Sequence, residues 1–175
     1  MKACTLSRKT GYPQWREWLA KEDQSGGAIL DLLSHDIDQA LKLFGQPDSV
    51  SAVSQGEVDT MVGSLHYARG FEVKIEGGWF PADVPFSAGF HIASENAALF
   101  LQAGELKLQL ADGEHTVDQP RSDEYRDEIH YFIECCRDNV TPAHCPPEDS
   151  ARAVHIATLL RRSREQNGKE VSCET

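Results

Sequence analysis

Residues 26–45 read GGAILDLLSHDIDQALKLFG and carry the strongest helical pattern in the chain. Apolar side chains recur there every three or four positions, which gathers them within about 60° at the ~100° step of an α-helix. Gly45 and Pro47 favour a stop, because glycine suits the position after a helix and proline cannot continue one. We therefore predict one amphipathic helix from about Gly26 to Phe44, with an apolar side made of Leu30, Leu33, Ile37, Leu41 and Phe44.

From about residue 49 to residue 117 the pattern changes to segments rich in apolar and β-branched residues, which are typical of strands. Tight links such as Ala68-Arg69-Gly70 and Ala103-Gly104-Glu105 separate these segments. Because short links join antiparallel neighbours, we expect a meander of about six strands. Its segments are 50–53, 58–67, 71–80, 87–93, 97–102 and 106–110.

Helical spacing returns in two segments near the C-terminus. The first runs from about Tyr125 to Cys136 with Ser122 or Asp123 as its cap, and the second lies between Pro146 and Gly168. Residues 3–6 suit an edge strand, and residues 170–173 suit a last short strand. Strands in the middle and helices at both ends predict an α+β fold for a single domain, 1–175. We expect an open, mainly antiparallel sheet with helices packed on one face.

The charge and the apolar content exclude several classes of partner. The chain has 17 Lys and Arg against 28 Asp and Glu, a formal net charge of -11, which repels phosphate backbones and anionic lipid. We therefore expect no nucleic acid and no membrane as a partner. No apolar run approaches the ~20 residues of a spanning helix, and the first residues lack an apolar signal core, so we predict a cytoplasmic protein. The odd count of five cysteines favours reduced thiols.

Asp31 and His35 stand four residues apart, so one face of the predicted helix would carry both. Oxidation of an alcohol requires a base for the hydroxyl proton, and an imidazole, which ordinarily titrates near pH ~6.5, suits that task. The carboxylate would orient the ring or bind a substrate hydroxyl. Gly26 and Gly27 would let a ligand or another backbone approach, because glycine has no Cβ. The spacing fits equally a solvated pair worth about 0.2 to 0.5 kcal/mol of helix stability.

The pattern Gly26-Gly27-x3-Asp31-x3-His35-x2-Asp38 resembles the signature of the Gfo/Idh/MocA family of oxidoreductases. It follows a tryptophan-bearing loop at residues 14–18, as it does in that family. Other likenesses follow in the family's order. They are the strand at 71–79 that ends in Trp79, the turn within 91–99, Tyr125 with Phe132, Pro142, the helix start at 148–153, and Ser163 with the segment 168–171.

The resemblance covers residues 3 to 173 and implies the C-terminal, substrate-binding and oligomerisation domain of an NAD(P)-dependent sugar or polyol dehydrogenase. It implies that His35 is the proton acceptor and donor and that Asp31 is its partner. It also makes Arg16, Trp15 and His91 candidates for contacts with a small sugar or polyol substrate.

The nucleotide-binding domain of that family has no counterpart here, because the sequence contains no G-x-G-x-x-G. We therefore expect no cofactor and no metal in this chain, and NAD or NADP in the complete enzyme. These 175 residues alone are not expected to turn over substrate.

Two other functions stay open at this point. A stand-alone, non-catalytic module that binds a small ligand or oligomerises would keep the fold without the redox chemistry. A metal-dependent phosphohydrolase would use His35-Asp36, but it needs further ligands on neighbouring helices, and His130 and His155 have no matching partner in the sequence.

We also expect a homo-oligomer, a dimer or a tetramer, whether or not the chain is catalytic. An open sheet leaves one face without helices, and a wide apolar face in water favours association. Trp79, Phe90 and Phe100 are the large side chains expected on that face.

Overall fold

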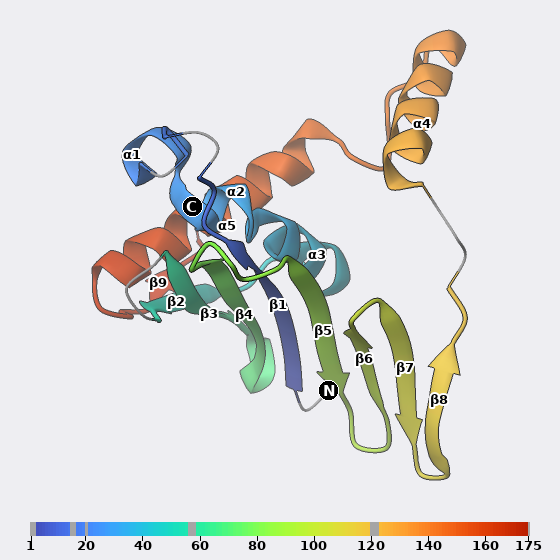
Figure 1. Ribbon diagram of the computed structural model, residues 1–175, viewed down its shortest axis with the longest axis horizontal. Coiled ribbons are helices and arrows are strands. Elements are labelled where there is room, and N and C mark those ends of the chain that lie inside the picture. The colour runs from blue at the N-terminus through green and yellow to red at the C-terminus, as the bar shows by residue number, and fades with distance from the viewer. Residues whose placement is uncertain (1–2, 15–16, 20, 56–58, 120–122, 175) are drawn as a thin grey trace.

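The computed structural model describes residues 3–14, 17–19, 21–55, 59–119 and 123–174. These residues form a nine-stranded open sheet in the order β8-β7-β6-β5-β1-β4-β3-β2-β9, with helices packed on one face (Figure 1). The α+β class and the open sheet are therefore confirmed, whereas the expected number of about six strands is too low. The three additional strands are the first, the last and a hairpin strand at 113–117.

The strands are β1 (Ala3–Gly11), β2 (Ser49–Ser54), β3 (Thr60–Tyr67), β4 (Phe71–Phe80), β5 (Ser87–Ala93), β6 (Ala98–Gln102), β7 (Glu105–Leu110), β8 (Gly113–Val117) and β9 (Val171–Ser172). The helices are α1 (Glu22–Ser25), α2 (Gly27–Asp31), α3 (Ser34–Phe44), α4 (Glu124–Asp138) and α5 (Pro147–Glu165), and a 3₁₀ turn covers Ala68–Gly70. None of the described helices is both long enough and apolar enough to cross a membrane.

Strand β1 occupies the centre of the sheet, so its prediction as an edge strand is wrong. It pairs parallel with β4, as in Leu6 with Ile75, and antiparallel with β5, as in Leu6 with Phe90. The connection between β4 and β5 therefore crosses over β1, and the meander is interrupted at this point. The alternation of residues 3–6 indicated a strand but not its neighbours, because register depends on partners that are distant in sequence.

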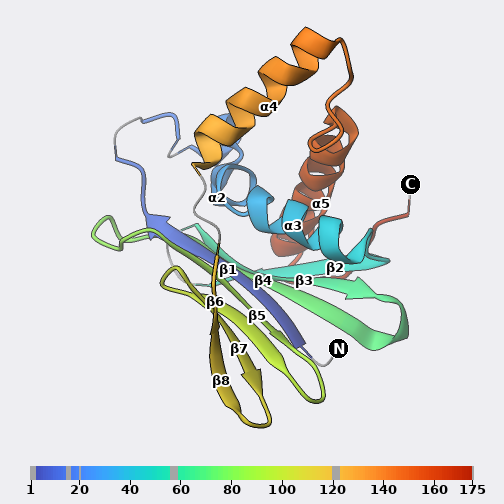
Figure 2. The same cartoon turned by 90° about the vertical axis from the view of Figure 1, so that its right-hand side faces the viewer.

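Helices α2, α3 and α5 lie over β1 to β4 and the short strand β9, and Phe90 and Ile92 of β5 pack at the margin of the same core (Figure 2). The main core lies between these helices and the strands. It includes Leu6, Leu33, Ile37, Leu65, Ile75, Ile156 and Leu160, each no more than 1% exposed. In the two views α4 projects away from this layer (Figures 1 and 2).

Two of the three aromatic residues predicted for the uncovered sheet face lie on the helix side. Trp79 is 2% exposed and packs with Ala28 and Leu32 of α2, and Phe90 packs against the main core. Only Phe100 stays on the uncovered face, beside His91. The register of β4 and β5 relative to β1 cannot be read from local periodicity, and a shift of one residue exchanges the two faces.

Burial divides the five cysteines into two groups, and all five are free thiols. Cys4, Cys135 and Cys173 are buried, whereas Cys136 and Cys145 are exposed. Loss of solvent around Cys4 and Cys173 raises the pKa of each thiol to about 11, which suppresses the reactive thiolate.

We predict that a thiol reagent such as DTNB modifies two cysteines in the native protein and all five after denaturation. Peptide mapping should find the native label on Cys136 and Cys145 only, because these two thiols are exposed. Rapid native labelling of Cys4 would contradict the packing of β1 against the helix layer.

Candidate active site

The helix that carries Asp31 and His35 is broken between them. Asp31 ends α2 and His35 is the second residue of α3, and the backbone N–H groups of Leu32 and Leu33 both donate to the carbonyl of Ala28, at 2.8 and 2.9 Å. The prediction of one continuous helix is therefore wrong at this turn.

Two consecutive leucines at the break are buried in different places. Leu32 packs against Trp79 in a small cluster, and Leu33 packs into the main core. The preceding pair repeats this division, because Ala28 packs in the small cluster and Ile29 in the main core.

Asp31 and His35 are both exposed, and no hydrogen bond or ion pair joins them in the part of the chain that the structure describes. Their side chains are therefore available to a ligand or to a partner domain. The helix break also means that their sequence spacing does not impose the contact expected at positions i and i+4 of one helix.

Asp36, the neighbour of His35, is only 2% exposed and forms an ion pair with Arg8 of the central strand β1. Arg8 Nε donates to Asp36 Oδ2 at 2.8 Å, and a second guanidinium nitrogen donates to Oδ1 at 3.3 Å. Burial raises the pKa of Asp36, and the hydrogen bonds and charge of Arg8 oppose this shift. The pair fixes the first turn of α3, and with it the backbone of His35, onto the sheet.

Sequence reasoning missed this pair, although one indication was present. Asp36 lies three residues after Leu33 and four before Ala40, so it falls on the buried side of the helix. A carboxylate in that position requires a cation or several donors nearby.

We predict that removing Arg8 destabilises the domain more than removing Asp36. Arg8→Met leaves the buried carboxylate unpaired and should lower the free energy of unfolding by about 3 kcal/mol in urea titrations at pH 7. Asp36→Leu should cost less, because Arg8 is 20% exposed and can turn toward water.

The cost of Arg8→Met should shrink as the pH falls, because an Asp36 whose folded pKa is raised above the ordinary ~3.9 binds its proton first in the folded state. The double variant Arg8→Met/Asp36→Leu should recover most of the stability that Arg8→Met loses. Asp38→Leu, at an exposed position two residues after Asp36, serves as the control and should change stability by less than about 0.5 kcal/mol. Equal costs for both single variants would contradict this description of the pair.

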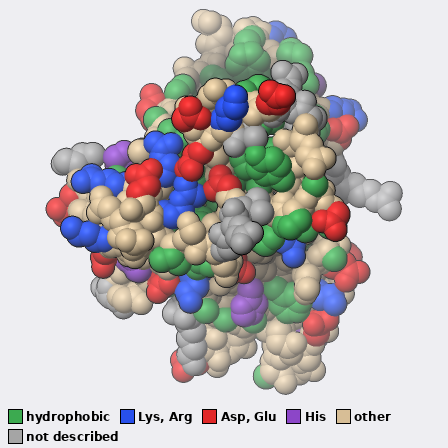
Figure 3. All heavy atoms as spheres, turned by 60° about the vertical axis from the view of Figure 1, so that its left-hand side comes forward, with side chains coloured by type: hydrophobic (Ala, Val, Ile, Leu, Met, Phe, Trp, Pro, Cys, Tyr) green, Lys and Arg blue, Asp and Glu red, His purple; other side chains and the backbone are tan. Residues whose placement is uncertain are grey.

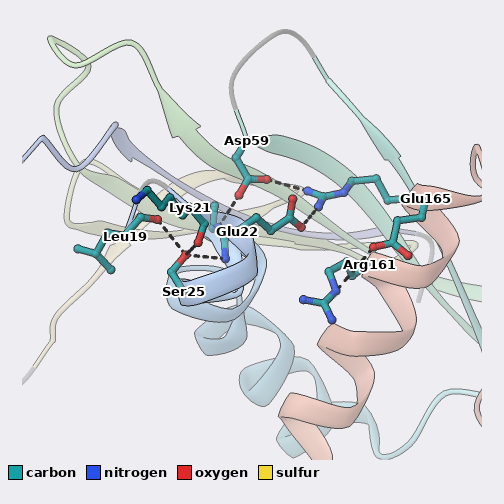
Figure 4. Close-up of polar contacts among 10 residues, drawn as sticks. Leu19, Lys21, Glu22, Ser25, Asp59, Arg161 and Glu165 are labelled. Atoms are coloured by element: carbon teal, nitrogen blue, oxygen red, sulfur yellow. Dashed lines mark hydrogen bonds and ion pairs between the residues drawn. The ribbon is translucent and has the colours of Figure 1, made fainter. Parts of the chain in front are cut away.

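A second carboxylate fixes the start of α2 (Figure 4). Asp59 Oδ2 accepts the backbone N–H of Ala28 at 2.6 Å, and Oδ1 accepts a hydrogen bond from Arg164 at 2.7 Å. Arg164, which is 10% exposed, also pairs with Glu22. Acidic and basic side chains are interspersed on the side of the molecule that carries α1 (Figure 3). This group of ion pairs links α1, α2, α5 and the start of β3.

The close approach that Gly27 permits is that of Asp59. Gly26 and Gly27 have φ angles of +79° and +70°, and a Cβ on Gly27 would lie 2.4 Å from Asp59 Oδ2. The glycine pair was expected to admit a ligand or another backbone, and the structure instead places a carboxylate of the same chain there. Local sequence patterns do not indicate this contact, because Asp59 and Ala28 are 31 residues apart.

The N-terminal half of the chain matches a known domain family. The family model for the GFO/IDH/MocA C-terminal domain matches residues 2–97, which include Asp31, Asp36 and His35. The chain belongs to the GFO/IDH/MocA C-terminal domain family. A search of the curated proteins finds no match.

Solved structures share the fold of this GFO/IDH/MocA domain at low sequence identity. Levoglucosan dehydrogenase in complex with NADH superposes with a TM-score of 0.79 at 16% identity, over 99% of this chain and 58% of that chain. UDP-N-acetylglucosamine 3-dehydrogenase from Acidithiobacillus ferrooxidans superposes with a TM-score of 0.76 at 17% identity, over 94% of this chain and 54% of that chain. Aldose-aldose oxidoreductase from Caulobacter crescentus superposes with a TM-score of 0.81 at 14% identity, over 98% of this chain and 55% of that chain. The domain thus spans little more than half the length of these structures.

The remaining candidates do not gather around His35 in the described part of the domain. His91 lies on the uncovered face of the sheet, paired with Thr5 and Phe100, whereas α3 covers the opposite face. His91 and His35 therefore lie on opposite sides of the sheet. Trp15 and Arg16 lie outside the described residues.

Gly26 and Gly27 of this GFO/IDH/MocA domain do not belong to a dinucleotide-binding motif. The sequence contains no G-x-G-x-x-G, Gly26 lies against Leu30, and Gly27, the first residue of α2, lies against the Asp59 carboxylate. Within the described ranges, no three His, Cys, Asp or Glu side chains gather as metal ligands would. What the domain offers is an exposed imidazole and an exposed carboxylate on a firmly held turn.

Proposed function

We propose that this domain is the substrate-binding half of an NAD(P)-dependent oxidoreductase that acts on a sugar, inositol or related polyol. The proposal is carried by Asp31 and His35, which are exposed on a turn that two buried or half-buried carboxylates hold in place. Family membership supports it, as do solved structures of the same fold that are named as sugar dehydrogenases. The nicotinamide cofactor would be held by a domain other than these residues.

His35 would accept the hydroxyl proton when the alcohol is oxidised and return it in the reverse direction. Such proton transfer needs a base within about 2.6 to 3.2 Å of the hydroxyl, and an exposed imidazole can be reached by the substrate. Asp31 would accept a hydrogen bond from a substrate hydroxyl or stabilise the protonated ring. Because His35 and Asp31 do not contact each other, a bound substrate hydroxyl would bring the two side chains into their working positions.

Rigid support of this turn is the contribution of the rest of the domain. The Arg8–Asp36 pair holds the residue after His35, and Asp59 with Arg164 holds the start of the helix that ends at Asp31. Misplacing a catalytic group by about 1 Å can reduce the rate about 10²-fold. The two anchored carboxylates therefore act as positioning residues in this proposal.

We predict that His35→Asn lowers kcat by about 10²- to 10⁴-fold in the enzyme that contains both this domain and its dinucleotide-binding domain, with a much smaller change in KM. Oxidation of candidate sugars and polyols would be followed by absorbance of the reduced nicotinamide. His115→Asn, at an exposed histidine on β8, is the matched control and should retain the parent rate. Full activity of His35→Asn would exclude the proposed proton transfer.

We further propose that the domain self-associates through the uncovered sheet face. Phe100, Val53 and Val62 lie on this face, among polar side chains of β1, β3 and β4. A shallow hollow of about 450 Å³ lies there, and its lining includes Thr5, Glu76 and His91. The face is thus more polar than the sequence suggested, and shape and hydrogen bonds would contribute to association alongside apolar contact.

We predict that light scattering at micromolar concentration gives the mass of a dimer or tetramer. Phe100→Asp should lower that mass, because it places a charge in the middle of the contact. Leu110→Asp, at a position that is 38% exposed on the helix side of β7, is the control and should leave the mass unchanged. A monomer at these concentrations would refute the contact.

A further inference from the structure

Helix α4 carries four large apolar side chains that the rest of the described chain leaves uncovered. Tyr125, Ile129, Phe132 and Ile133 are 79%, 59%, 58% and 57% exposed. At ~100° per residue they lie within about 100° of the helix circumference. We call this set the α4 apolar stripe. A continuous apolar stripe on a helix normally packs against another surface.

The α4 apolar stripe is not the side by which α4 is attached to its own chain. The hydroxyl of Tyr131 accepts the backbone N–H groups of Ala143 and His144 at 2.6 and 3.1 Å, and Cys135 is buried near the same loop. Around the helix, Tyr131 and Cys135 lie about 110° to 150° from the middle of the stripe. One side of α4 is therefore anchored, and another side presents the stripe to a partner.

The sheet has a second uncovered apolar region on the same side as the helices. Leu99 pairs with Leu108 and Leu101 pairs with Leu106, and their side chains share the face of Phe90, which packs into the core. Helices α2, α3 and α5 lie over β1 to β4 and not over these strands.

The charge of α4 argues against a lipid surface as the occupant. The helix has five acidic and two basic residues, whereas helices that lie on membranes are rich in Lys and Arg on their polar face. The structural relatives indicate a different partner. This domain matches 54% to 58% of the length of the two sugar dehydrogenases above. More than two fifths of each of those chains therefore has no counterpart here. One of them was solved with NADH bound.

We propose that the α4 apolar stripe is a docking surface for a dinucleotide-binding domain. This inference rests on the proposed function and adds the surface by which the two halves would be joined. The stripe supplies apolar area, and its polar flanks on α4 supply the rim that protein interfaces normally have.

The test is a photo-cross-linking experiment in cells of the source organism, with the natural polypeptide and whatever sequence accompanies it there. Ile129 is replaced by p-benzoylphenylalanine, and Ile133 is replaced in a second variant in case the first does not fold. Glu134 is the matched control, because it is exposed on α4 about 150° from the middle of the stripe. Thermal unfolding shows whether each variant has folded, and mass spectrometry identifies the cross-linked peptide.

Cross-links from position 129 or 133 to a dinucleotide-binding domain, at a yield at least tenfold above that from position 134, are expected. Cross-links to a second copy of α4, equal yields from all three positions, or no cross-link from a folded variant would overturn the proposal. Its failure is separable from failure of the proposed function, because the loss of activity in His35→Asn does not depend on which surface joins the two halves.

Discussion

The ion pair between Arg8 and Asp36 is the interaction on which the candidate site depends. It joins the central strand of the sheet to the first turn of α3, next to His35, with both guanidinium hydrogen bonds directed at one carboxylate. A bidentate pair fixes orientation as well as distance, which a hydrophobic contact does not. The His35 side chain is therefore exposed to solvent, while the residue next to it is tied to the central strand.

The start of α2, at the other end of residues 27–44, is also held in place by a carboxylate. At the start of α2 the Asp59 carboxylate replaces the missing hydrogen-bond partner of a helix N-terminus, and Arg164 neutralises it. Between these two anchors the helix breaks at Leu32 and Leu33, each packed in its own cluster. The exposed residues of the site are thus positioned by residues that do not need to touch a substrate.

Periodicity predicted the fold class, both C-terminal helices and the helical character of residues 27–44, because these depend on local spacing. The cap at Asp123 and the proline start of α5 were also predictable from local chemistry. Local chemistry did not predict three other features. These are the central position of β1, the faces of Trp79 and Phe90, and the contacts of Asp36 and Asp59. Each of these requires the register between segments that lie tens of residues apart, and one sequence carries no direct record of it.

The position of β1 has a consequence for how the domain reaches its native state. It is the only strand that joins β2, β3, β4 and β9 to β5, β6, β7 and β8 within the described sheet. Strand β1 is synthesised before both of its partners, which follow about 70 to 90 residues later in the sequence. Contacts so distant in sequence slow folding, and until they form the four-stranded ribbon from β5 to β8 has no helix layer to rest on. The last step of assembly would then be the insertion of β1 between β4 and β5.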